Sequence, residues 1–153
     1  VYQIDVSTGE IRKVDTGIRF TNGIAFGPDD SLYENETLSG MVYRYRADGA
    51  GTLGDRETFG TVIDPAAAPG YKGPDGMKFA ANGELYVTVV GQGDVTVLGP
   101  DGGVVDRIRT RGALPSNVAF GPSGSRRLYV TEDEFGAMEV FDVGVDGLPL
   151  HCG

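Results

Sequence analysis

The feature of this chain that most limits its fold is an internal repeat. Three segments share one pattern, in which a strand-like stretch ending in Phe is followed by a turn and by a second stretch that begins Leu-Tyr. The repeated residues are Phe26, Phe79 and Phe120, and then Leu32-Tyr33, Leu85-Tyr86 and Leu128-Tyr129. A spacing of roughly 40 to 50 residues, with several short strands in each unit, is typical of the blades of a β-propeller. The repeat therefore predicts an all-β chain built from four-stranded antiparallel blades.

The rest of each unit fits the same pattern. A third stretch alternates between apolar and polar residues or runs apolar, as strands of a sheet do. These stretches are Met41–Tyr45, Asp94–Leu98 and Ala137–Phe141, and each is followed by an Asp-Gly turn that begins at Asp48, Asp101 or Asp146. A fourth strand follows in two units. We expect about 13 strands in all, and almost no helix.

The repeat divides the chain into the parts of a single incomplete domain that covers residues 1–153. The predicted parts are the end of a preceding blade (1–16), one complete blade (18–62), a second complete blade (73–110), three strands of a third (114–142) and a tail (143–153). Together they make about half of a six-bladed ring. Such an open stack leaves bare sheet edges and a half-covered core, which proteins avoid, so another part must complete it.

Two arrangements would complete the ring. In the first, two copies form a homodimer, and the N-terminal strand of each copy supplies the fourth strand of the other copy's last blade. In the second, the natural protein is about twice as long. The chain starts at Val1 rather than at a methionine, so the sequence leaves both open. Either way, the repeated apolar residues are expected to be buried between blades, namely Phe26, Phe79, Phe120, Leu32, Leu85, Leu128, Val87 and Val130.

Charge and composition exclude several classes of partner. A net charge of −9 repels phosphate backbones, so we expect no nucleic acid partner. No stretch approaches the roughly 18 apolar residues of a membrane span, and the N-terminus does not have the pattern of a signal peptide. The single Cys152 forms no internal disulfide, and the compartment stays open, with a soluble, cytoplasmic protein favoured. His151 and Cys152 are interpreted as surface residues, and the glycosylation sequon at Asn35 as a chance match.

Two Asx-Gly pairs are the best candidates for a functional site. Asn22-Gly23 and Asp75-Gly76 each open the first strand of a unit, and in a propeller that strand borders the central channel. Side-chain oxygens from successive blades would then meet at one mouth of the channel, where they suit a hard cation such as Ca²⁺ or Mg²⁺. The structural alternative is that both pairs are only turn formers. Ser116 holds the same place in the third unit and is a poor metal ligand; a structural role is favoured, and a hydroxyl that lines the channel is the alternative.

These segments resemble a known family. Thr21–Phe26, Gly73–Met77 and Asn117–Gly121, together with the closing segment 143–150, are similar to the gluconolactonase / senescence marker protein (regucalcin) / luciferin-regenerating enzyme family. The resemblance covers almost the whole chain and implies the C-terminal half of a six-bladed propeller. It also implies a divalent metal held by an early Glu, an Asn and an Asp, with the Asp as general base. Asn22 and Asp75 match that Asn and Asp, and the Glu has no counterpart here.

The resemblance implies one function, and the residues leave a second open. The first is a metal-dependent lactone hydrolase, or the C-terminal half of one. It would act on a small lactone or sugar-acid substrate with Ca²⁺, or with Zn²⁺, Mg²⁺ or Mn²⁺, and Asp75 would be both metal ligand and base. The second is a non-catalytic propeller segment that binds a small ligand or a protein and is inactive because the N-terminal half of the site is absent. Propellers host many unrelated functions, so the fold alone does not choose between the two.

Overall fold

Thirteen β-strands make up the fold, as the repeat predicts, in a computed structural model that describes residues 1–149. His151 and Cys152 lie outside the described residues. The strands are β1 (Tyr2–Ile4), β2 (Ile11–Lys13), β3 (Thr21–Phe26), β4 (Leu32–Glu36), β5 (Met41–Ala47), β6 (Leu53–Thr61), β7 (Gly73–Phe79), β8 (Leu85–Val90), β9 (Asp94–Leu98), β10 (Val104–Arg109), β11 (Pro115–Phe120), β12 (Arg127–Glu132) and β13 (Ala137–Asp142). Over residues 1–149 there is no helix that could cross a membrane.

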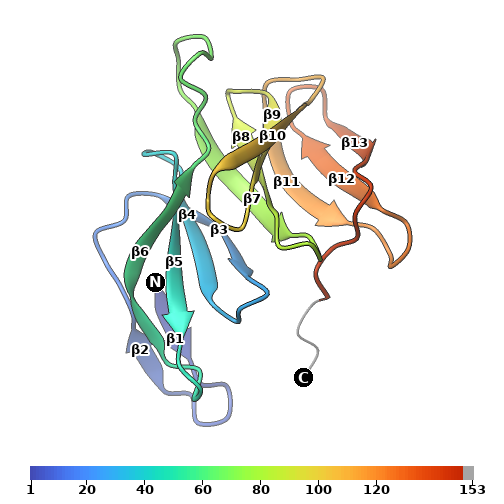
Figure 1. Cartoon of the computed structure of the whole chain (residues 1–153). Helices are drawn as coiled ribbons and strands as arrows, with labels where there is room; N and C mark the ends of the chain where they lie inside the picture. Colours follow the sequence, from blue (N-terminus) through green and yellow to red (C-terminus); the bar gives the residue numbers. More distant parts are fainter. Residues whose placement is uncertain (150–153) are drawn as a thin grey trace.

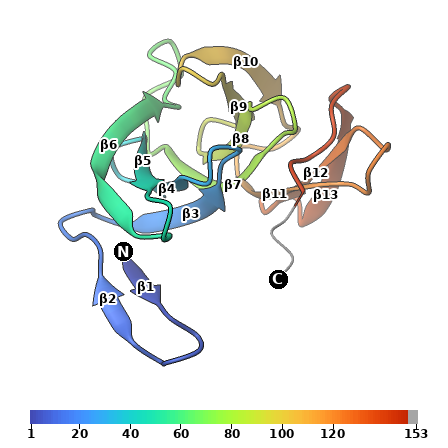
Figure 2. The ribbon, with the colours of Figure 1, turned by 60° about the horizontal axis from the view of Figure 1, so that its bottom comes forward.

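The strands form four antiparallel sheets, each a simple meander. A hairpin of β1 and β2 is followed by the four-stranded sheets β3–β6 and β7–β10, and then by the three-stranded sheet β11–β13. Figures 1 and 2 show these sheets following one another along an arc, with the hairpin at one end and β11–β13 at the other. The first strands β3, β7 and β11 pack against one another. The prediction of four-stranded antiparallel blades is thus confirmed.

The core lies between neighbouring sheets. One apolar cluster joins β3–β6 to β7–β10, and in it the Tyr33 ring meets the rings of Phe79 and Phe59 edge-on, with centroids 4.7 and 4.9 Å apart. A second cluster, which includes Tyr86 and Leu128, joins β7–β10 to β11–β13. Because the middle sheet has a neighbour on each face, every residue of β9 is buried.

Six of the eight residues predicted to be in the core are buried, namely Phe79, Leu32, Leu85, Leu128, Val87 and Val130. Phe120 is half-buried and packs edge-on against Tyr86, with ring centroids 5.2 Å apart. The prediction for Phe26 is wrong, since its side chain is 50% exposed. Phe26 lies on the face of the first complete sheet that is turned toward the β1–β2 hairpin, and it borders a hollow of about 700 Å³ beside Tyr2 and Leu53.

Candidate functional site

The candidate site is built on three β-bulges. The pairing of a first strand with the second strand of its sheet shifts register at Asn22-Gly23 in β3, at Asp75-Gly76 in β7 and at Ser116 in β11. A bulge kinks the strand and redirects the side chains beside it, and bulges are common next to functional sites. The same irregularity in three successive sheets places Asn22, Asp75 and Ser116 in equivalent positions.

Close packing between sheets explains the glycines of the Asx-Gly pairs. A Cβ atom on Gly23 would lie 2.1 Å from the main-chain oxygen of Asp75, and one on Gly76 would lie 2.1 Å from Oδ1 of Asn117. Neither glycine has a positive φ. The interpretation of these pairs as turn formers is therefore wrong, because the glycines let the first strands of adjacent sheets touch.

The structure brings the side chains of Asn22 and Asp75 together. The Asn22 side chain lies close enough to the Asp75 carboxyl group to lower its pKa. Asn22 Nδ2 also donates to Thr37 Oγ1 at 3.3 Å, and Thr37 Oγ1 donates to the main-chain oxygen of Pro74 at 2.8 Å. The two candidate residues therefore belong to one polar network that crosses from the first complete sheet to the second.

Asn35, which the sequence did not single out for a functional role, bonds to the main chain of this network. Its side chain is fully buried in β4, where Oδ1 accepts from the Gly23 amide at 3.1 Å and Nδ2 donates to the main-chain oxygen of Asp75 at 2.7 Å. The sequon at Asn35 is thus a chance match in this fold, since the amide nitrogen is occupied and out of reach of solvent.

The repeat itself carried a signal for this role. Thr88 occupies the position of Asn35 in the next unit, and its Oγ1 donates to the main-chain oxygen of Gly76 at 3.0 Å. In both sheets a short polar side chain of the second strand satisfies the main chain at a bulge. A polar residue at this position is buried in both sheets and therefore needs a hydrogen-bond partner, so it predicts such a contact.

The environment of Asp75 determines its charge. Partial burial raises the pKa of this carboxyl group, and the nearby Asn22 side chain and Gly76 amide offset part of the rise. The negative charge of Asp133, directly after β12, raises the pKa further. Within residues 1–149 no Lys, Arg or His forms an ion pair with Asp75. A carboxylate that is partly removed from water without a cationic partner would gain from a bound cation.

The side-chain oxygens of Asn22 and Asp75 are of the kind that a hard cation prefers. Asn22 and Asp75 offer amide and carboxylate oxygens, which Ca²⁺ and Mg²⁺ prefer. In the described part of the chain no group of three or more His, Cys, Asp and Glu residues is arranged to hold a metal ion. The remaining ligands of such an ion would come from water, from a substrate or from the rest of a ring.

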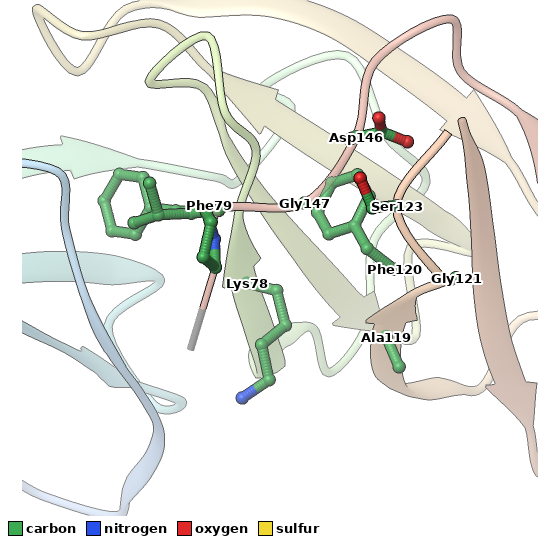
Figure 3. A pocket seen from close by; sticks show the side chains of 10 residues that line it. Lys78, Phe79, Ala119, Phe120, Gly121, Ser123, Asp146 and Gly147 are labelled. Atoms are coloured by element: carbon green, nitrogen blue, oxygen red, sulfur yellow. The ribbon is translucent and has the colours of Figure 1, made fainter. Parts of the chain in front are cut away.

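The opposite ends of the first strands border a different hollow. About 340 Å³ is enclosed by Lys78, Phe79, Phe120, Asp146 and their neighbours, where the segment after β13 crosses β7. Figure 3 shows the Lys78 ammonium group directed away from Asp146. Mostly apolar side chains and main chain line this hollow, and it contains neither of the predicted site residues.

Comparison with known proteins gives consistent matches, and each match covers about half the length of the relative. Residues 1–133 match the family model described as "SMP-30/Gluconolactonase/LRE-like region". The chain is 32% identical over 150 residues to diisopropyl-fluorophosphatase from Loligo vulgaris, covering 94% of this chain and 46% of that protein. It is 33% identical over 137 residues to 6-deoxy-6-sulfogluconolactonase from Pseudomonas putida, covering 83% of this chain and 46% of that one.

A solved structure supports the fold. The luciferin-regenerating enzyme superimposes with a TM-score of 0.80 at 21% identity, covering 96% of this chain and 52% of that one. The chain therefore spans about half the length of the proteins it matches. These matches confirm the resemblance found in the repeated segments, and with it the prediction of half a six-bladed propeller.

Proposed function

The chain belongs to the SMP-30/gluconolactonase/LRE-like family, and we propose that it is the C-terminal half of a metal-dependent lactone hydrolase. The observation that carries the proposal is the meeting of Asn22 and Asp75 in equivalent bulges of adjacent sheets. The substrate would be a small lactone or sugar-acid derivative. The preferred cation is Ca²⁺, because both donors are oxygens; Mg²⁺, Mn²⁺ and Zn²⁺ are the alternatives.

Asn22 and Asp75 would hold the cation through their side-chain oxygens. When bound, a divalent cation supplies Lewis-acid polarisation of the lactone carbonyl. Asp75 would accept the proton of the attacking water while the ring ester bond breaks and the ring oxygen becomes a hydroxyl group. Asn22, which is bonded to Thr37 and lies beside the Asp75 carboxyl group, would help to orient that carboxylate. Asn35 would hold the Asp75 main chain in place from the adjacent sheet.

The second candidate is a non-catalytic propeller segment that binds a small ligand or a protein. It is favoured by the small number of metal-ligating side chains beside Asn22 and Asp75. Within residues 1–149 no group of three or more His, Cys, Asp or Glu residues is arranged to hold a metal ion. The two candidates differ in turnover, which the second lacks.

Calcium titration and lactone hydrolysis test the proposal. Calorimetry with Ca²⁺ alone is expected to show binding that Asn22→Ala weakens, and Asp75→Ala is expected to abolish hydrolysis of D-glucono-1,5-lactone. Asp101→Ala is the control, because Asp101 lies in an exposed turn, where it accepts a hydrogen bond from Gly103 N at 3.0 Å. An Asp75→Ala variant with undiminished turnover would remove Asp75 as the base.

A further inference from the structure

The repeat places a second carboxylate beside the candidate site. Thr37, directly after β4, is equivalent to Asp133, directly after β12. Each contacts the bulge residue of its own sheet. Thr37 Oγ1 lies 3.3 Å from Asn22 Nδ2, and Asp133 Oδ1 accepts from Ser116 Oγ at 3.0 Å. Asp133 therefore lies at the same end of the first strands as Asn22 and Asp75, and it comes from the sheet β11–β13.

Asp133 is held in place but keeps room for a ligand. Its amide donates to the main-chain oxygen of Leu114 at 3.0 Å, which fixes the backbone. Its side chain is exposed, and the hydrogen bond from Ser116 uses only Oδ1. Within residues 1–149 no cationic side chain pairs with Asp133. This carboxylate can accept a further hydrogen bond.

Chemistry determines what such a carboxylate selects. An ionised carboxylate accepts hydrogen bonds and donates none, so it favours a ligand with hydroxyl groups and disfavours an anionic one. A hydrogen bond to a charged acceptor contributes about 1.5 to 3 kcal/mol, roughly ten-fold or more in affinity. The Ser116 hydroxyl donates to Asp133 and lies 3.0 Å from Thr131 Oγ1, so one Ser116 lone pair is left to accept from a second hydroxyl group of the same ligand. A lactone or phosphoester without donors gains nothing from this pair.

We propose that Asp133 is a specificity-determining residue, whose carboxylate accepts a hydrogen bond from a hydroxyl group of a polyhydroxylated lactone bound at Asp75. This inference rests on the proposed function and assigns the substrate preference to a residue of the sheet β11–β13. Asp133 selects the substrate by its hydroxyl groups, while Asp75 acts on its ester group.

Two cyclic amides that resist hydrolysis provide the test. D-gluconolactam and δ-valerolactam share a six-membered ring, and only the first carries hydroxyl groups. NMR titrations of the full chain in Ca²⁺ buffer are expected to show tighter binding of gluconolactam. Asp133→Ala is expected to lower gluconolactam affinity about ten-fold and to leave valerolactam affinity unchanged. Asp133→Asn keeps an acceptor for Ser116 but not the charge, so its loss should be smaller.

Controls separate this effect from misfolding and from the activity itself. Asp101→Ala should keep the wild-type ratio of the two affinities, and the Asp133 variants should unfold at the wild-type denaturant concentration. An unchanged ratio in Asp133→Ala, or no preference for gluconolactam in the wild-type chain, would overturn the proposal. Binding that depends on Asp133 without hydrolysis of any lactone would overturn the hydrolase and support the role of Asp133. Lactone hydrolysis together with a ratio of the two lactam affinities that Asp133→Ala leaves unchanged would support the hydrolase and overturn the role of Asp133.

Discussion

The side chain of Asn35 in one sheet is bonded to the main chain of Asp75 in the next, with Nδ2 2.7 Å from the Asp75 oxygen. Since Asn35 also accepts from the Gly23 amide, one buried side chain joins the two Asx-Gly bulges. The position of Asp75 thus depends on contacts between sheets as well as on its own strand. Stability and site geometry are coupled at this residue.

Asn35→Ala is expected to destabilise the fold by about 1 to 3 kcal/mol, because it leaves the Gly23 amide and the Asp75 oxygen without their buried partner. The control is Asn82→Ala, in an exposed turn where Asn82 accepts only from the Glu84 amide at 3.2 Å. Urea unfolding of both variants measures the difference. Equal unfolding midpoints for the two variants would show that the bridge contributes little.

Gly76→Ala is expected to force the sheets β7–β10 and β11–β13 apart. The new Cβ would meet Oδ1 of Asn117 at 2.1 Å and the Cα of Asn117 at 2.8 Å. Overpacking of this kind costs about 1 to 3 kcal/mol. Gly49→Ala is the matched control, because a Cβ there would have no neighbour within 4 Å and Gly49 has no positive φ. Thermal unfolding compares the two. A Gly76→Ala variant as stable as Gly49→Ala would contradict the close approach.

The repeat was sufficient to predict the blades, because alternating apolar residues and Asp-Gly turns are local signals. It also placed Asn22 and Asp75 at equivalent positions. It did not predict the exposure of Phe26, since burial depends on which sheet lies opposite and not on the residue's own strand. Asn35 and Asp133 were missed for a related reason. Their contacts join strands that are distant in sequence, and only the register of the repeat hints at them.

Glu34 departs from its repeat and makes stability depend on pH. Val87 and Val130 hold the equivalent buried positions, whereas Glu34 is 2% exposed and neither of its carboxylate oxygens has a hydrogen-bond partner among the described residues. Burial, reinforced by the charges of Glu36 and Asp15 and opposed by those of Arg56 and the N-terminal amine, raises its pKa from 4.5 to about 7.

The sign of the pH dependence follows from this shift. Between pH 4.5 and about 7 the folded chain keeps the Glu34 proton and the unfolded chain does not, so the free energy of unfolding falls as pH rises. The fall amounts to about 3 kcal/mol and is complete above the folded-state pKa.

Glu34→Gln is expected to remove this slope and to be more stable than the wild-type chain above pH 7. Urea unfolding at several pH values measures it, with the exposed Glu10→Gln as control. A Glu34→Gln variant that keeps the wild-type slope would assign the pH dependence to another group.

The 153-residue chain is expected to associate with itself, because apolar side chains are uncovered at both ends of the arc. Ile24 and Phe26 are 55% and 50% exposed on the first complete sheet, and Met138 and Val140 are 66% and 50% exposed on the last strand. In a two-fold dimer, the N-terminal strand of one copy would pair with β13 of the other as its fourth strand and close a ring of six blades. Sedimentation should then show a dimer, and deletion of residues 1–16 should disrupt it. Val140→Ser should weaken it, while Val6→Ser, in the exposed β1–β2 turn, should not. A folded monomer at low concentration would exclude closure by a second copy and leave a longer polypeptide to complete the ring.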